Sequence, residues 1–257
     1  MRSILLVLCG GLVAVGIILA ARGTMPVGLA AAPAPATTGD KAVLGKAIRD
    51  YLMANPEVLV EAMQELERKQ DSQRDTVAQK AIQENRSALM SDPESPIVGN
   101  PNGDVTIVEF SDYQCPYCKR AHTTVKSVLA ADSKVKLVFK DLPILGEPSR
   151  IAALAALAAR AQNKHLALHD ALMEFSGKLD RDRIMEIAGS VGLDVARLQK
   201  DMDDPKLKEI IERNMALASA LGVRGTPAFV IGKQFVPGAV DADTLKQMIA
   251  AARKDQT

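Results

Sequence analysis

Two cysteines stand between a strand-like segment and a helical one, in the stretch SDYQCPYCKRAH of residues 111–122. The run VTIVEF before them is β-branched and apolar, as in a buried strand, and KRAHTTVKSVLAAD after them has a helical pattern. This order puts Cys115 at the start of a helix and Cys118 one turn later on a similar face. The two sulfur atoms can therefore form a reversible disulfide bond. Any fold of this chain must lead a strand directly into a helix at this pair.

The N-terminal residues MRSILLVLCGGLVAVGIILAAR have the pattern of an export signal, with one arginine ahead of an apolar run over residues 4–21. Small residues near Ala30 offer a cleavage site, which gives a signal peptide over residues 1–30 and a tether over residues 31–39. The run is at the lower edge of the length that spans a bilayer, so an uncleaved membrane anchor is the alternative. In both cases we expect the rest of the chain to be periplasmic.

The exported part of the chain keeps a single pair of cysteines. The sequence contains 3 cysteines, and we interpret Cys9, inside the leader, as a passive residue. A bond between Cys115 and Cys118 would close too small a loop to add much stability. Pro116 suits the first helical position, and the free N–H groups and dipole of the helix favour the reactive thiolate of Cys115. The pattern therefore predicts disulfide exchange, with Cys118 resolving the mixed disulfide.

Residues 40–96 are predicted to form a helical arm and a linker. Asp40 can cap a first helix, and Asn55 followed by proline and glutamate starts a second. Both helices have an apolar face, whereas residues 64–75, QELERKQDSQRD, form a solvated helix or a flexible connector. The arm either folds back on the main domain or associates with copies of itself. The polar connector favours association, so we expect an oligomerisation arm.

Residues 97–257 are predicted to form one α/β domain. A second strand, KVKLVFKDLP, completes a β-α-β unit, and a helical insert follows at about residues 148–221, with helix caps near Asp180, Asp194 and Asp204. A hairpin and a final helix, DADTLKQMIAAARK, close the domain. The 32 basic and 31 acidic residues give no charge excess of the kind that nucleic-acid binding needs, so no nucleic-acid partner is expected.

Strand, C-x-x-C, helix and a later Thr-Pro before a strand together resemble the thioredoxin fold, and the details resemble its exported DsbA-like branch. The closest likeness is to the ScsC-type (suppressor of copper sensitivity) subgroup. Its signatures look like GNPNGDVTIVEFSDYQCPYCKRA, DLPILGEPSRIAALAALAA and LGVRGTPAFVIGKQFVPGAVD, which cover most of residues 97–241. The resemblance implies a thioredoxin fold with a helical insertion, preceded by an N-terminal helical arm.

The resemblance also implies roles for individual residues. Cys115 would attack and Cys118 would resolve. Thr226 and Pro227 match the loop whose cis proline faces the active cysteines, where the backbone of Thr226 would pair with an extended client peptide. Glu109 matches a buried acid that assists proton movement from the resolving thiol.

Three residues near the cysteines are assigned to client contact: Pro116 and Tyr117, between them, and Thr226. Tyr117 would also tune the thiolate. An exposed spacer residue would have the same sequence pattern as Tyr117.

The implied function is an exported protein-disulfide oxidoreductase, and the arm resembles that of isomerase-like ScsC proteins, which are oligomers. We therefore expect a disulfide isomerase assembled by its N-terminal helices, possibly a trimer, with a DsbA-like net dithiol oxidase as the alternative. The expected partners are cysteine-containing exported client proteins and a membrane redox partner, reducing or oxidising. No cofactor is expected besides the redox-active Cys115–Cys118 disulfide.

Two functions of other classes compete with this one. A copper- or zinc-holding thiol protein could use Cys115, Cys118 and His122, but a closed zinc site needs a fourth ligand. His165 and His169 have the i,i+4 spacing expected of a helix surface, so no metal ligand is assigned. An adaptor whose arm is the functional part, with the pair as a staple, would not need the cysteines at a helix start.

Overall fold

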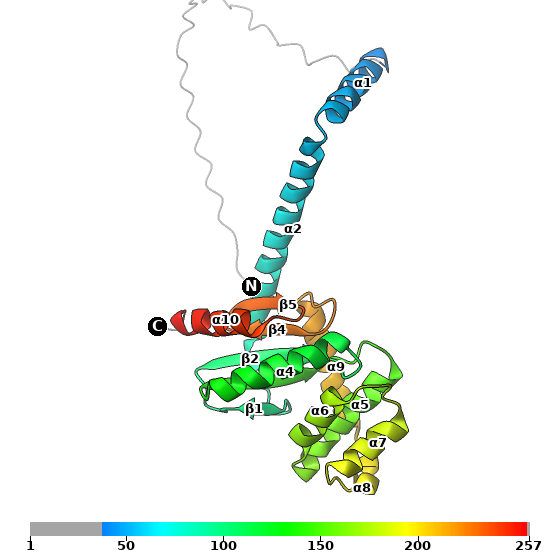
Figure 1. Ribbon diagram of the computed structural model, residues 1–257, viewed down its shortest axis with the longest axis vertical. Helices are drawn as coiled ribbons and strands as arrows, with labels where there is room; N and C mark the ends of the chain where they lie inside the picture. Colours follow the sequence, from blue (N-terminus) through cyan, green and yellow to red (C-terminus); the bar gives the residue numbers. More distant parts are fainter. Residues whose placement is uncertain (1–37, 256–257) are drawn as a thin grey trace, which may run out of the picture. The chain divides into compact units, whose positions relative to one another are not determined.

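The structure is a computed structural model, and it describes residues 38–255 (Figure 1). The predicted signal peptide or anchor of residues 1–30, most of the tether and Cys9 lie outside these residues. The described chain forms two compact units that meet in the sequence at Leu59 and Val60, and each is described by itself.

The order of helices and strands follows the predicted order, with a short additional strand at the start of the sheet. The helices are α1 (Thr38–Ala54), α2 (Glu57–Glu84), α3 (Arg86–Met90), α4 (Pro116–Ala131), α5 (Glu147–Ala158), η1 (Ala159–Gln162), α6 (His165–Glu174), α7 (Arg181–Ser190), α8 (Val195–Asp201), α9 (Pro205–Ala220) and α10 (Ala242–Lys254). The strands are β1 (Ile97–Gly99), β2 (Val105–Ser111), β3 (Val135–Asp141), β4 (Ala228–Ile231) and β5 (Gln234–Pro237).

The described part of the first unit, residues 38–59, consists of α1 and the first residues of α2. Because α1 begins at Thr38, Asp40 lies in its first turn instead of capping it. The helix ends before Asn55, whose side-chain amide donates to the carbonyl of Tyr51 at 2.9 Å. None of residues 39–59 is buried. The large apolar side chains that α1 leaves exposed are Val43, Leu44, Ile48, Tyr51 and Met53.

In the second unit, α2 continues as a single exposed helix through residues 64–75, so this segment is a solvated helix and not a break. From Ala78 onward the helix contributes to a core. Ala81 and Ile82, with Leu89 and Met90 of α3, are buried against the sheet.

The sheet has five strands in the order β1-β3-β2-β4-β5. β2 and β3 run parallel, from Val105 opposite Val135 to Ser111 opposite Asp141, and α4 connects them. β4 is antiparallel to β2, and β5 completes a hairpin with β4. Strand β1 was not predicted, because three residues carry too little pattern of their own; pairing with the edge of β3 holds them extended.

Both faces of the sheet are covered (Figure 1). Helices α4 and α10 pack on the face that carries Ile107, Leu137 and Phe229. The end of α2, with α3 and α9, packs on the face that carries Val108 and Val230. The two faces are apolar at alternate positions of β2, as expected for a central strand buried on both sides.

The helical insert, α5 to α9, forms its own core, which also takes in Tyr113, Cys115 and Cys118. Its central helix, α5, is so rich in alanine that residues 152–159 are all buried. The predicted caps are confirmed at three helix starts, where a carboxylate accepts a backbone N–H: Asp180 from Arg183, Asp194 from Arg197 and Asp204 from Lys206.

No helix within residues 38–255 combines the length and the apolar character that crossing a membrane requires.

Candidate functional site

The two cysteines lie where β2 gives way to α4. Cys115 is the residue before the first turn of α4, with extended backbone angles, and its N–H donates to the carbonyl of Asp112 at 3.0 Å. Pro116 occupies the first helical position, as predicted. Both thiols are free and buried, and Cys118 has no exposed surface at all. The pair is therefore shaped by the end of the strand and the start of the helix, with its first sulfur nearer to solvent.

The loop of Thr226 and Pro227 lies directly against the first cysteine. The Cys115 thiol donates to the carbonyl oxygen of Thr226 at 3.1 Å, across 111 positions of sequence. The peptide bond between Thr226 and Pro227 is cis, which confirms the expected backbone geometry of this loop. The backbone of Thr226 is thus at the sulfur atom that would bond to a client.

Cys118 is held in a different environment from Cys115. Its sulfur accepts the N–H of Asp112 at 3.5 Å. Burial raises the pKa of the Cys118 thiol far above its ordinary value, and the charge of Glu109 adds to that effect. The second cysteine therefore keeps its proton until a base takes it.

Glu109 lies inside the sheet, as its apolar neighbours predicted. It is 2% exposed, near the middle of β2. Burial raises its pKa to about 8, and the nearby charge of Asp141 acts in the same direction. A carboxyl group with this pKa can both hold and release a proton near neutral pH.

Asp141 is a second buried acid that the sequence analysis missed. The parallel register places it opposite Ser111 at the end of β3, two residues beyond Phe139, which lies opposite Glu109. It is buried, and burial raises its pKa to about 7. The alternation of β3 was the available signal, since Asp141 follows Leu137 and Phe139 on one face.

Asp112 braces the loop before Cys115, and no sequence pattern singled it out. Its carboxylate accepts N–H groups from Gln114 at 2.8 Å, Ile144 at 2.8 Å and Leu145 at 3.0 Å. These bonds tie the loop before Cys115 to the segment that follows β3.

A groove of about 1090 Å³ opens beside the cysteine pair. Thr226, Pro227, Tyr117 and Arg120 line one side of it, and the Arg120 guanidinium lies 4.4 Å above the Tyr117 ring. The other lining residues are Gln70, Gln73, Arg74, Val77, Leu221, Gly222, Arg224, Gly225, Ala228, Phe235, Pro237, Gly238 and Ala239. An extended peptide that lay along Thr226 would meet the exposed ring of Tyr117 here.

A family model described as DSBA-like thioredoxin domain matches residues 106–250. The chain belongs to the DsbA-like thioredoxin family. The predicted thioredoxin fold is thereby confirmed. A second model, described as Copper resistance protein ScsC N-terminal domain, matches residues 40–73, which confirms the likeness to ScsC-type proteins.

Three known proteins illustrate the similarity of this DsbA-like chain. A thioredoxin-like oxidoreductase from Silicibacter pomeroyi DSS-3 is 50% identical, with a TM-score of 0.65, and the match covers 66% of this chain and 98% of that one. A linker-deletion mutant of Proteus mirabilis ScsC is 30% identical, with a TM-score of 0.65 over 88% of this chain and 100% of that one. The Na(+)/H(+) antiporter NhaA of Herminiimonas arsenicoxydans is 31% identical over 63% of this chain. The matched part is 26% of the antiporter, so the chain spans about a quarter of that relative.

The DsbA-like domain buries histidines that were expected on a helix surface, and that expectation is wrong. His165 and His169 are 8% and 1% exposed. The reason is that α6 faces the sheet and α4, so that the Phe139 ring lies 4.2 Å from the His169 ring, centroid to centroid. Burial lowers the pKa of His165 to about 3 and that of His169 well below its ordinary value.

The histidine of α4 turns toward α6 and not toward the cysteines. His122 is 6% exposed, and its Nε2 lies 3.4 Å from Oδ1 of Asp170. Among residues 38–255, the group of potential metal ligands that converges is His122, His169 and Asp170, and it contains neither cysteine. The thiol-based metal set considered from the sequence is therefore not assembled in the described chain.

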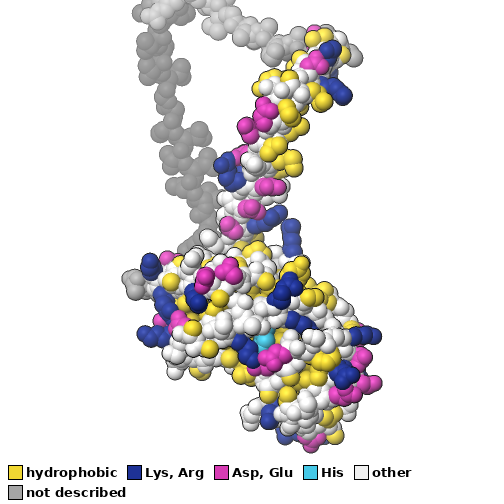
Figure 2. Space-filling view, viewed as in Figure 1, with side chains coloured by type: hydrophobic (Ala, Val, Ile, Leu, Met, Phe, Trp, Pro, Cys, Tyr) yellow, Lys and Arg dark blue, Asp and Glu magenta, His cyan; other side chains and the backbone are white. Residues whose placement is uncertain are grey.

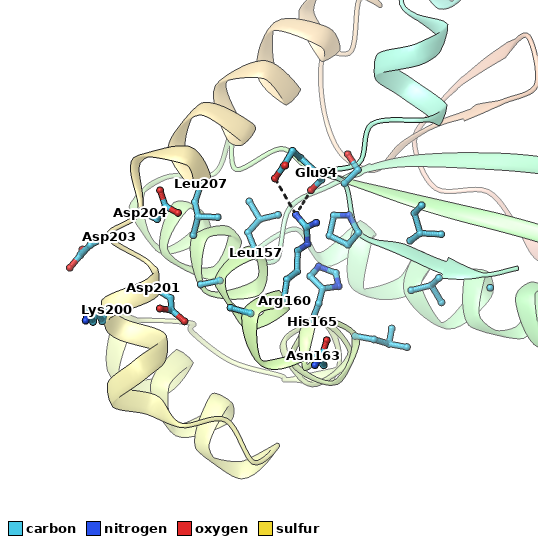
Figure 3. A pocket seen from close by; sticks show the side chains of 18 residues that line it. Glu94, Leu157, Arg160, Asn163, His165, Lys200, Asp201, Asp203, Asp204 and Leu207 are labelled. Atoms are coloured by element: carbon cyan, nitrogen blue, oxygen red, sulfur yellow. Dashed lines mark hydrogen bonds and ion pairs between the residues drawn. The ribbon is translucent and has the colours of Figure 1, made fainter. Parts of the chain in front are cut away.

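Another cavity of the DsbA-like domain, of about 1260 Å³, lies between the insert and β1 (Figure 3). Arg160 and Glu94 meet inside it, where the Arg160 guanidinium donates to the Glu94 carbonyl at 2.5 Å and lies 3.7 Å from its carboxylate. Neither cysteine lines this cavity. Arg160 there ties the insert to the segment before β1, which is a structural role.

Proposed function

We propose that this chain is an exported, periplasmic thiol:disulfide oxidoreductase that acts on the disulfide bonds of client proteins, and that it works as an isomerase. The observation that carries the proposal is the contact of the Cys115 sulfur with the Thr226 carbonyl at 3.1 Å, with Cys118 buried one turn behind it. One sulfur is placed where a client backbone can dock. The other sulfur, that of Cys118, is buried, so we propose that it reacts with Cys115 and not directly with a client.

In the proposed isomerase cycle the pair begins reduced. The Cys115 thiolate attacks one sulfur of a client disulfide, and the other client sulfur leaves as a thiolate. That thiolate attacks a second disulfide of the same client, which frees a new client thiolate. A client thiolate then attacks the sulfur bound to Cys115, and Cys115 leaves as a thiolate with no net change in oxidation.

When a mixed disulfide stalls, Cys118 releases it. The Glu109 carboxylate takes the proton of the Cys118 thiol, and the resulting thiolate attacks the sulfur of Cys115. The client leaves as a thiolate and the pair becomes a disulfide. In an isomerase, a membrane redox partner would then return two electrons to the pair. In an oxidase, this disulfide would instead oxidise a client dithiol to a client disulfide, and the partner would take two electrons from the reduced pair afterwards.

The groove supports a protein client over a small thiol. The Thr226 backbone lies at one edge, and Tyr117 and Pro116 precede Cys118 on the first turn of α4. Main-chain pairing gives affinity for any extended peptide, and an apolar wall accepts side chains of varied shape. Such a site suits clients that are recognised by exposed cysteines and not by one sequence.

The arm supports assembly. Helix α1 leaves Val43 and Met53 more than two-thirds exposed, at 73% and 74%, and none of the described residues 39–59 is buried. Monomeric proteins rarely expose large contiguous patches of apolar side chains to water. The match of residues 40–73 to the ScsC N-terminal domain supports a self-associating arm, which we propose forms an oligomer, with a trimer as the proposed number of chains. Several reduced pairs around one client would favour isomerisation.

The test uses two assays on the exported full chain: repair of a scrambled disulfide protein, and oxidation of a reduced one. We expect repair by the wild-type chain and loss of both activities in Cys115→Ser. In Cys118→Ser we expect mixed disulfides with clients to accumulate on a non-reducing gel, because the resolving sulfur is gone.

The outcomes separate the alternatives. A wild-type chain that oxidises reduced clients but repairs nothing would be the net oxidase. Activity retained by Cys115→Ser would remove the catalytic assignment altogether.

A further inference from the structure

We propose that His122, His169 and Asp170 form a binding site for a divalent transition-metal ion between α4 and α6, separate from the cysteine pair, with Glu174 at its outer edge. One ligand atom from each of the three residues lies within 4.8 Å of the others. The ligands come from two helices that the fold packs against each other. The site does not depend on the exchange activity proposed above.

The spacing fits a metal ion better than it fits a hydrogen bond. Nε2 of His122 and Oδ1 of Asp170 are 3.4 Å apart, and Nε2 of His122 is 3.8 Å from Oε1 of Glu174. Two atoms that each lie about 2.0–2.1 Å from a tetrahedral ion are roughly 3.3–3.4 Å apart. The His122–Asp170 separation is therefore already that of two ligands of one ion.

The same two atoms, Nε2 of His122 and Oδ1 of Asp170, lack a hydrogen bond to any described residue. Both atoms are buried. Buried polar atoms without a partner carry a desolvation cost, so they need an explanation. An ion held between them would satisfy both.

The third ligand is held in place from behind. Nδ1 of His169 lies 2.9 Å from the hydroxyl of Tyr113, and the ring packs on Phe139. Histidines that bind metals are commonly oriented by a hydrogen bond to their other ring nitrogen. Tyr113 stands two residues before Cys115, so this bond also links the site to the active loop.

A lysine now occupies the outer side of the site. Nζ of Lys126 lies 3.0 Å from Oδ2 of Asp170 and 2.9 Å from Oε1 of Glu174. The ammonium balances two carboxylates that would otherwise repel each other. An incoming cation would compete with it, so removal of Lys126 should strengthen metal binding.

The site has a route to solvent. Figure 2 shows a small area of histidine surface bordered by acidic and basic side chains. Asp170 is partly exposed and Glu174 is exposed, so an ion can enter past the carboxylates. Two imidazoles with a carboxylate suit Zn²⁺ and its neighbours in the first transition row, with water completing the coordination.

The test is titration of Zn²⁺ into the full chain carrying Cys9→Ser, Cys115→Ser and Cys118→Ser, which removes all 3 thiols of the sequence. We expect one ion per chain by calorimetry and a higher unfolding temperature with zinc. His122→Gln and Asp170→Asn should each weaken binding by at least about 10–100-fold, the loss that even an outer-shell partner causes. Lys126→Gln should strengthen it.

His165→Gln is the matched control, since this buried histidine lies one turn before His169 and outside the group. Two results would overturn the site: no zinc binding by the parent, or binding that His122→Gln and Asp170→Asn leave unchanged. An equal loss in His165→Gln would overturn the choice of ligands. Should His122→Gln fail to fold, Asp170→Asn at the partly exposed edge decides alone.

Discussion

The two units of this chain depart from the usual distribution of polar and apolar side chains in opposite directions. The second unit buries acids, Glu109 and Asp141, whereas the first exposes large apolar residues such as Ile48 and Tyr51. Both arrangements cost stability in an isolated chain. Departures of this kind concentrate where a protein performs chemistry or meets a partner. The contrast is in line with our proposals that the second unit handles protons at its buried acids and that α1 associates with a partner.

The largest expected effect concerns the buried acid. The folded chain holds a proton on Glu109 up to about pH 8, whereas the unfolded chain releases it near the ordinary value of 4.5. The unfolded state therefore binds fewer protons between these values. The free energy of unfolding falls as pH rises, by about 1.4 kcal/mol per pH unit and by about 5 kcal/mol over the whole interval. In Glu109→Gln this contribution is absent. The free energy of unfolding of the variant should therefore rise relative to that of the wild type between pH 5 and pH 8.

Urea unfolding at pH 5 and pH 8 measures this difference. Glu212→Gln on the exposed side of α9 serves as the control and should follow the wild type. If Glu109→Gln and the wild type lose stability equally with pH, the buried charge is not what sets the dependence.

Charged substitutions on the apolar face of α1 should change the mass of the protein in solution and not the stability of the second unit. Leu44→Asp with Ile48→Asp puts two charges on the exposed apolar face of α1, and we expect the oligomer to dissociate to monomers in light scattering. The urea midpoint of the second unit should stay within about 0.5 kcal/mol, as for surface changes. Lys41→Asp, a polar position of the same helix, should keep the oligomer. An oligomer that survives the double substitution would place the interface elsewhere.

The smallest expected effect is local to one helix start. Asp180→Ala removes the carboxylate that accepts the N–H of Arg183 at 3.0 Å, and should cost about 1 kcal/mol in urea unfolding. Asp182→Ala, at the second residue of α7 and not at the capping position, should cost less. Asp50→Ala, which breaks an exposed pair with Lys46 in α1, should leave the second unit unchanged. If Asp50→Ala lowered the stability of the second unit as much as Asp180→Ala does, the expectation that the Lys46–Asp50 pair adds nothing to that unit would be wrong.

Local signals in the sequence were enough for three helix starts and for the burial of Glu109. An aspartate before a helical run is a local capping signal, so Asp180, Asp194 and Asp204 could be predicted without knowledge of the fold. The same signal was misplaced at Asp40, because α1 begins two residues earlier, at Thr38. Glu109 could be placed because Val108 and Phe110 beside it belong to a strand buried on both faces.

Residues whose environment comes from a distant segment could not be placed. His165 and His169 have a spacing that fits a surface equally well, and only the packing of α6 against β3 and α4 buries them. Asp141 joins Glu109 through the register of two strands. The contact of Cys115 with Thr226 spans 111 positions, and the likeness to a family, not local periodicity, predicted it.

The alanine-rich helix α5 has a consequence for how freely this protein can change. Residues 152–159 are buried all the way round, so nearly every side chain larger than the native one would overfill its surroundings, at about 1–3 kcal/mol each. The neighbouring helices can change in sequence on their solvent-exposed faces. Their distance from α5, however, is set by alanine side chains, which are almost the smallest available. We therefore expect substitutions to be tolerated least in a segment that lines no part of the groove beside Cys115.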